Sequence, residues 1–128
     1  MKKFLSIFAV ATAISFAAVA QDGAAINFTE TEYDFGTLVQ NSLAEHQFSF
    51  TNTGNAPLIL SGHTTSCGCT VPSYPKDTPI APGEGGVITV KYNRTDNVVP
   101  FNKTVTINSN AVNTPSAKLT IKGDVKAK

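Results

Sequence analysis

Two cysteines separated by a single glycine, Cys67-Gly68-Cys69, are the most reactive side chains in this sequence. A disulfide between them would close a loop so short that it removes only about 1.6 kcal/mol of unfolded-chain entropy, so it would add little stability. A bond in so small a ring is also prone to strain and easily reduced, which would suit a redox role. A redox-active pair is therefore one interpretation of this segment.

A metal site is a second interpretation of the same segment. His63 precedes Cys67 by four residues, and two thiolates with an imidazole are soft ligands suited to zinc or cuprous ion. A closed zinc site needs a further ligand, and the fold would have to bring in His46 or Asp77. The sequence thus leaves open a metal site at His63, Cys67 and Cys69.

A third interpretation is structural. Cys67 and Cys69, bridged or reduced, would shape a tight loop and pack as small apolar groups, and Gly68 would allow a positive φ. A cysteine nucleophile with His63 as its base would need an orienting group and an oxyanion hole, and no such motif accompanies the pair. We therefore expect no enzymatic activity and no cofactor.

Short apolar runs separated by Gly, Pro, Asn and Asp must position this loop, and this pattern predicts β-strands. From Glu45 to Thr51, His46, Phe48 and Phe50 alternate with polar residues, as in a half-buried strand. Because His46 shares the apolar face, we interpret it as a partly buried core histidine and not as a ligand. The predicted strands cover residues 25–28, 33–39, 45–51, 57–61, 87–92, 103–109 and 117–125.

The region from His63 to Pro82 is predicted to be irregular because it contains four prolines. It is the longest loop-like region, where function would most plausibly reside. The apolar trio Leu58-Ile59-Leu60 before it predicts a strand deep in the core. About seven or eight strands in a chain of this size predict an all-β, immunoglobulin-like antiparallel β-sandwich. The cysteines are too close in sequence to bridge two sheets, so core burial must stabilise the domain.

The N-terminal segment has the pattern of a secretory signal peptide. Lys2 and Lys3 precede an apolar stretch from Phe4 to Ala17, and the small residues of Ala18-Val19-Ala20 end before the polar Gln21. We expect cleavage after residue 20, and no lipid anchor because Gln21 is not a cysteine. The stretch is shorter than the roughly 20 strongly apolar residues of a membrane anchor. A periplasmic or extracellular protein is predicted.

The remaining segment, residues 21–128, is predicted to form one domain. Loss of Lys2 and Lys3 takes the 10 basic residues to 8 against 9 acidic ones, a formal charge of −1. No basic surface for nucleic acid is therefore expected. The tripeptide Asp34-Phe35-Gly36 is not a kinase element, since no Gly-rich loop or catalytic-loop motif accompanies it. We interpret it as a strand with Phe35 in the core and Gly36 at a bend.

Four motifs follow one another along the chain: Tyr33-Asp34-Phe35-Gly36, Phe48-Ser49-Phe50-Thr51-Asn52-Thr53-Gly54-Asn55-Ala56-Pro57-Leu58, Ser66-Cys67-Gly68-Cys69-Thr70-Val71-Pro72 and Ile80-Ala81-Pro82-Gly83-Glu84. In this order they resemble the DUF1573 domain family, and the resemblance covers nearly all of residues 21–128. Members of that family are mostly exported bacterial proteins, abundant in Bacteroidetes and similar to the immunoglobulin-like ASH and major-sperm-protein domains. The family has no established activity, and related domains act mainly as interaction or scaffold modules.

Two functional hypotheses follow. The first is a non-catalytic protein-binding or scaffold module that holds another envelope or extracellular protein through a sheet edge or the proline-rich loop, with no nucleic acid partner and no membrane insertion after signal cleavage. The alternative is a redox-active or soft-metal (copper or zinc) handling protein that acts through the Cys67-Gly68-Cys69 loop, with His63 assisting.

Overall fold

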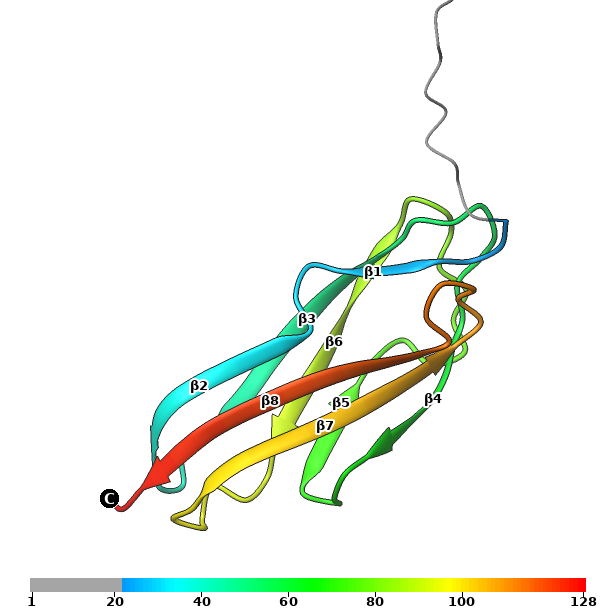
Figure 1. The fold of residues 1–128 in the computed structure, drawn as a ribbon. Coiled ribbons are helices and arrows are strands. Elements are labelled where there is room, and N and C mark those ends of the chain that lie inside the picture. The colour runs from blue at the N-terminus through cyan, green and yellow to red at the C-terminus, as the bar shows by residue number, and fades with distance from the viewer. Residues whose placement is uncertain (1–21) are drawn as a thin grey trace, which may run out of the picture.

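The computed structural model describes residues 22–128, which form two packed β-sheets (Figure 1). The first sheet has the order β1-β3-β6-β5 and the second the order β2-β8-β7-β4, with four strands each. The predicted all-β, immunoglobulin-like sandwich is therefore confirmed, with one parallel pair, β2 and β8, among antiparallel ones. The predicted signal peptide, residues 1–20, lies outside the described residues. The strands are β1 (Ile26–Phe28), β2 (Glu32–Val39), β3 (Ala44–Asn52), β4 (Leu60–Thr65), β5 (Thr70–Ser73), β6 (Gly85–Tyr92), β7 (Pro100–Ser109) and β8 (Ser116–Lys126).

No helix occurs between residues 22 and 128, and hence none that is long and apolar enough to cross a membrane.

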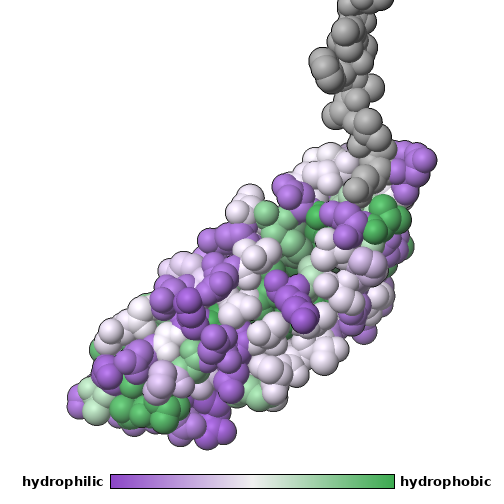
Figure 2. Space-filling model, viewed as in Figure 1, coloured by the Kyte–Doolittle hydropathy of each residue, from purple (hydrophilic) through white to green (hydrophobic). Residues whose placement is uncertain are grey.

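The core lies between the sheets, and strand alternation builds it. In β3, Phe48 and Phe50 are almost completely buried, whereas Gln47 and Ser49, which alternate with them, are exposed. Ile107 of β7 and Ile121 of β8 are buried from the opposite sheet. Each such side chain contributes about 1.5 to 3 kcal/mol through burial. The visible outer face is consequently mostly hydrophilic (Figure 2).

The chain changes sheet between β1 and β2. β1 pairs with β3 only over Phe50 to Asn52, and the chain then crosses to lie beside β8. The register of β2 shifts between Asp34 and Thr37, where Gly36 has a φ of 69° that favours glycine. Phe35 packs against the core. The prediction for Asp34-Phe35-Gly36 is therefore confirmed.

Leu58 and Leu60 are completely buried as expected, but two predictions near the proline-rich region were wrong about where the strands lie. Leu58 forms only an isolated bridge with Ile80, and β4 begins at Leu60 and continues to Thr65, inside the region predicted to be irregular. β5 was missed, because Pro72 argued against a strand. β5 lies at the edge of its sheet, so the nitrogen of Pro72 can face outward. The N–H that proline lacks is then not needed for a hydrogen bond to β6.

One end of the sandwich carries the loop between β6 and β7, the turn between β2 and β3, and the C-terminus (Figure 1). The two loops are joined by hydrogen bonds: the Asn41 N–H donates to the Thr95 carbonyl at 2.9 Å, and the Thr95 hydroxyl donates to the Ser42 carbonyl at 2.7 Å. Apolar surface is also visible at this end, the lower end of Figure 2. Val98 and Val99 of the β6–β7 loop are 44% and 47% exposed.

Candidate functional site

The Cys67-Gly68-Cys69 segment forms the turn between β4 and β5, and the two sulfurs are joined in a disulfide with the Cα atoms 5.3 Å apart. The turn is held by both sheets. The Ser66 N–H donates to the Thr104 carbonyl of β7 at 3.1 Å, and the Asn93 N–H, just after β6, donates to the Cys69 carbonyl at 2.7 Å. The disulfide therefore has a fixed place at one end of the sandwich.

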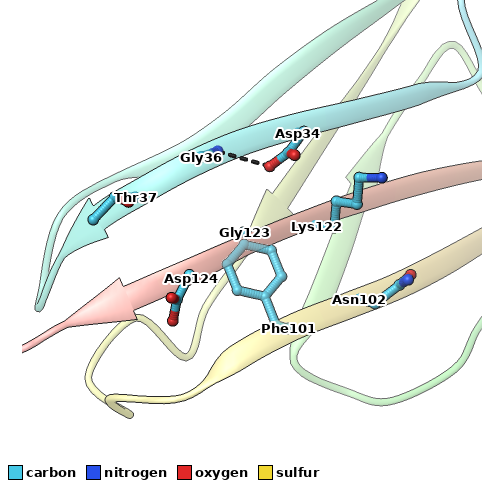
Figure 3. Close-up of a pocket in the computed structure, with 8 residues that line it drawn as sticks. All are labelled: Asp34, Gly36, Thr37, Phe101, Asn102, Lys122, Gly123 and Asp124. Atoms are coloured by element: carbon cyan, nitrogen blue, oxygen red, sulfur yellow. Dashed lines mark hydrogen bonds between the residues drawn. The ribbon is translucent and has the colours of Figure 1, made fainter.

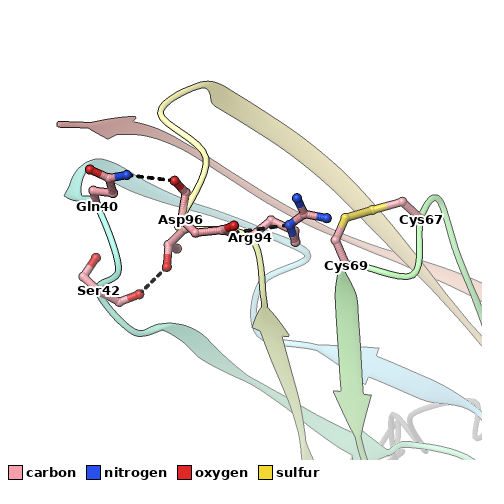
Figure 4. A network of polar contacts seen from close by, with 7 residues as sticks. Gln40, Ser42, Cys67, Cys69, Arg94 and Asp96 are labelled. Atoms are coloured by element: carbon pink, nitrogen blue, oxygen red, sulfur yellow. Dashed lines mark hydrogen bonds and ion pairs between the residues drawn. A yellow bond between two sulfur atoms is a disulfide. The ribbon is translucent and has the colours of Figure 1, made fainter.

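An open depression of about 460 Å³ lies beside the disulfide. Tyr92 and Phe101, whose rings stack with centroids 4.0 Å apart, contribute to its apolar lining. Arg94 and Lys103 are its cationic residues, and no acidic side chain of residues 22–128 lines it. The Arg94 Nε donates to the Asp96 carboxylate at 3.3 Å, while its guanidinium is directed toward the bonded sulfurs (Figure 4). The depression thus combines a disulfide, an aromatic surface and positive charge.

Ionisation of the Tyr92 phenol at alkaline pH tests how tightly this side chain is packed beside the depression. Burial raises the pKa of the Tyr92 phenol above its ordinary value of 10.0; Arg94 opposes this rise and Asp96 adds to it. Because the folded protein holds this proton more tightly than the unfolded chain, stability is kept below pH 10 and lost as the pH rises beyond it. We expect Tyr92→Phe to lose less stability than the wild type above pH 10 in urea unfolding. Parallel loss in the two proteins would contradict this.

The disulfide is expected to be a weak stabiliser. Its loop is so short that reduction should lower the free energy of unfolding by only about 1 to 2 kcal/mol. Urea unfolding with and without reductant measures this, and the double variant Cys67→Ser with Cys69→Ser serves as the control that cannot be oxidised. Complete unfolding on reduction would show that the bond is a structural staple after all.

His63 is placed against Tyr74. The His63 Nδ1 and the Tyr74 hydroxyl are 2.8 Å apart, and the two rings meet edge to face. This contact joins β4 of one sheet to the segment after β5 of the other. Because Cys67 and Cys69 are bonded to each other, they offer no thiolate pair in this form. The predicted metal site at His63, Cys67 and Cys69 therefore stays a prediction that concerns the reduced protein.

The additional ligands considered from the sequence lie in other settings. His46 stacks on Tyr33 with ring centroids 3.7 Å apart, pairs with the Glu30 carboxylate and leaves 19% of its side chain exposed. The prediction of a partly buried core histidine is confirmed. The Asp77 N–H donates to the Leu60 carbonyl. Among residues 22–128, no group of three or more His, Cys, Asp or Glu side chains is placed to hold a metal ion.

A second depression, of about 410 Å³, lies where β2, β7 and β8 adjoin (Figure 3). Its charged groups already have partners. Asp34 accepts a hydrogen bond from the Gly36 N–H at 2.8 Å, Lys122 pairs with Glu32 at 2.6 Å, and the Asp124 carboxylate pairs with a lysine on the same strand. We therefore assign it a structural role.

The sequence did not reveal an unpaired stretch of strand edge. The Thr29 N–H donates to the Ser49 carbonyl, and the chain then leaves the sheet, so no strand among residues 22–128 pairs with the first half of β3 on this side. Strand alternation directs the N–H and C=O groups of Glu45 and Gln47 outward there. An open groove of about 500 Å³ runs beside them and is also lined by Leu43, which is 67% exposed. The shortness of the first apolar run, residues 25–28, was the available signal.

Similar folds occur in solved structures of low sequence identity. A protein of unknown function from Porphyromonas gingivalis W83 is 19% identical in sequence, with a TM-score of 0.70. The match covers 84% of this chain and 50% of the Porphyromonas chain. The chain therefore spans half the length of that protein. The ASH/PapD-like domain 7 of human CEP192 is 7% identical with a TM-score of 0.65, covering 80% of this chain and 86% of that domain.

The periplasmic chaperone SfaE matches with a TM-score of 0.56 at 10% sequence identity. The match covers 79% of this chain and 58% of the chaperone chain. No curated protein matches this sequence. These likenesses confirm the expected relation to ASH-type immunoglobulin-like folds. The model of the family described as "Protein of unknown function (DUF1573)" matches residues 26–125, so the chain belongs to the DUF1573 family.

Proposed function

We propose that this protein is an exported, non-catalytic module that binds another envelope or extracellular protein by adding an extended segment of it to the sheet at β3. The unpaired half of β3 carries the proposal. The backbone groups of Glu45 and Gln47 face outward there, and a partner strand would occupy the place that β1 vacates after Phe28. Main-chain hydrogen bonds to such an edge supply affinity, and adjacent grooves supply specificity.

The two outer strands of the same sheet, β1 and β5, have protected edges, which favours β3 as the site within this sheet. On the outer side of β1, the Asn113 side chain accepts from the Ile26 N–H at 3.0 Å and donates to the Ile26 carbonyl at 2.8 Å. In β5, Val71 faces β6 and Pro72 faces outward without an N–H to offer. Native sheets commonly prevent their edge strands from pairing with other chains in these ways. In the part of the chain that the structure describes, no side chain binds the backbone of the exposed stretch of β3, and the strand contains no proline.

The groove beside β3 gives the partner segment a chemical character. Leu43 offers an exposed apolar contact at one end, and Glu45 has a carboxylate directed to solvent. Glu30 lies nearby, held by His46. An extended segment with an apolar side chain and a basic neighbour would match this surface.

Two features support export. The sequence begins with a basic pair followed by an apolar stretch and small residues. The fold is also similar to that of a periplasmic chaperone. N-terminal sequencing of the protein recovered from its native cells tests this part; a first residue of Gln21 supports export, and an intact Met1 argues against it.

The binding proposal is tested by substituting a single position in two ways. Gln47→Pro removes the outward N–H, whereas Gln47→Ala keeps the backbone and removes only the side chain. We expect binding partners to be captured from the native envelope by the wild type and by Gln47→Ala, with at least about a tenfold loss for Gln47→Pro. Circular dichroism and urea unfolding would check that both variants fold. Equal capture by all three proteins would refute use of this edge.

A further inference from the structure

We infer that the Cys67–Cys69 disulfide is a thiol-exchange site that accepts electrons from small, negatively charged thiols, with Arg94 and Lys103 as the residues that position the thiol and stabilise the products. This activity is separate from the proposed binding at β3. Thiol exchange and strand binding can fail independently, because the disulfide lies in the turn between β4 and β5, and β6 separates β5 from β3 in the sheet.

The disulfide is accessible from solvent. Both cysteines are part-exposed, only the exposed Gly68 stands between them, and both line the open depression. The volume of about 460 Å³ is within the range of small-molecule sites. A thiol that enters the depression can therefore reach the sulfurs without unfolding of the domain.

The charge around the disulfide favours its reduction. Arg94 and Lys103 line the depression, and the lining residues that the structure describes include no acidic one. Neighbouring cations stabilise a thiolate relative to a thiol, so the reduced form is favoured and the disulfide becomes a better oxidant. The same cations raise the local concentration of an anionic thiol. Asp96 binds the Arg94 Nε, and the rest of the guanidinium is directed toward the sulfurs (Figure 4).

The two sulfurs differ in surroundings, which sets the direction of attack. Cys69 packs against the hydrophobic core, and Cys67 is not among the residues that do so. The incoming thiolate is therefore expected to attack the Cys67 sulfur. A bond forms between these two sulfurs, the Cys67–Cys69 bond breaks, and its electron pair leaves with Cys69 as a thiolate near Arg94.

A second thiolate completes the reaction. It attacks the thiol-derived sulfur of the mixed disulfide, forms a new disulfide between the two small thiols, and releases Cys67 as a thiolate. In total, two thiolates are oxidised to one disulfide, and the protein disulfide is reduced to two thiolates. No other oxidant or reductant is required.

Reduction rates with thiols of opposite charge test the charge preference. We would measure the reduction of the full mature protein by glutathione, which is anionic, and by cysteamine, which is cationic, at equal thiolate concentrations. Wild type is expected to react about tenfold faster with glutathione, with the preference shrinking at high salt. The double variant Arg94→Gln with Lys103→Gln should lose the preference, whereas Lys118→Gln, remote from the depression, should keep it. No preference in the wild type, or one unchanged in the double variant, would overturn the inference.

The same variants test the equilibrium. The double variant is expected to shift the exchange equilibrium with glutathione about tenfold toward the protein disulfide, equal to about 30 mV. An unchanged equilibrium would remove the role assigned to the two cations.

Single cysteine variants test the direction of attack. By microscopic reversibility, Cys69→Ser should form a mixed disulfide with oxidised glutathione at Cys67 several-fold faster than Cys67→Ser forms one at Cys69. Intact mass follows the reaction, and urea unfolding confirms that both variants are folded. Equal rates, or a faster reaction at Cys69, would reject the assigned order.

Discussion

Replacing Asn52 by alanine is expected to lower the free energy of unfolding by about 3 to 4 kcal/mol. The Asn52 side chain is completely buried at the end of β3. Its carbonyl accepts from the N–H groups of Ala25 at 3.3 Å and Gly54 at 3.0 Å, and its amide donates to the carbonyls of Ala56 at 2.8 Å and Ile80 at 2.9 Å. Alanine would leave these backbone groups without their partner in the interior.

Asn55 provides a matched control, three residues along the same turn. Its side chain makes two hydrogen bonds at the exposed surface, accepting from the Gly23 N–H and donating to the Asp22 carboxylate. Asn55→Ala should therefore cost no more than about 1 kcal/mol. Urea unfolding of the two variants measures the difference. A loss of stability in Asn52→Ala no greater than that in Asn55→Ala would show that the buried amide does not organise the turn.

Gly54→Ala is expected to destabilise the domain by about 3 kcal/mol. A Cβ at this position would lie 2.1 Å from the Gly23 carbonyl oxygen and 2.6 Å from the Ala25 nitrogen, and both of these are backbone atoms. Making room would move the segment before β1 away from the turn. That movement would lengthen the hydrogen bond from the Asn55 N–H to the Gly23 carbonyl, now 3.0 Å.

The control for this substitution is Gly62→Ala in β4. Apart from its chain neighbours, no residue between 22 and 128 has a heavy atom within 4 Å of a Cβ at Gly62, so the change should alter stability by no more than about 0.5 kcal/mol. Thermal and urea unfolding would compare the two variants. Similar stability of Gly54→Ala and Gly62→Ala would mean that the close approach at Gly54 relaxes without cost.

Much of the fold could be predicted because local pattern and tertiary packing agree. The alternation of Phe48 and Phe50 with polar neighbours predicted both the strand and its buried face, and His46 followed the same face. The bend at Gly36 was likewise predicted from its place beside Phe35. In these segments the local sequence pattern and the packing of the sandwich favour the same conformation and the same burial for each residue.

The failures lie where long-range contacts decide. Leu58 has the pattern of a strand residue, but it pairs only with Ile80, distant in sequence. Pro72 argues against a strand unless the strand is known to be an edge, and sheet order cannot be deduced from local pattern. The four hydrogen-bond partners of the Asn52 side chain span residues 25 to 80, and no local pattern indicates them.

The candidate site was only partly predictable for the same reason. The reactive segment was evident from Cys67 and Cys69 themselves. Arg94 and Lys103 were not associated with it, because β6 and β7 bring them to the disulfide from more than twenty residues away. His63, close to Cys67 in sequence, instead lies against Tyr74. Spacing along the chain indicated the chemistry of the site and not its surroundings.

Amide hydrogen exchange of the complex with a captured partner tests the central claim most directly. If the partner adds a strand to β3, exchange at the Glu45 and Gln47 N–H groups should slow by at least about tenfold. The Val90 N–H of β6, already within the sheet, serves as the reference. Unchanged exchange at Glu45 and Gln47 in the complex, with slowing elsewhere on the surface, would contradict binding at this edge.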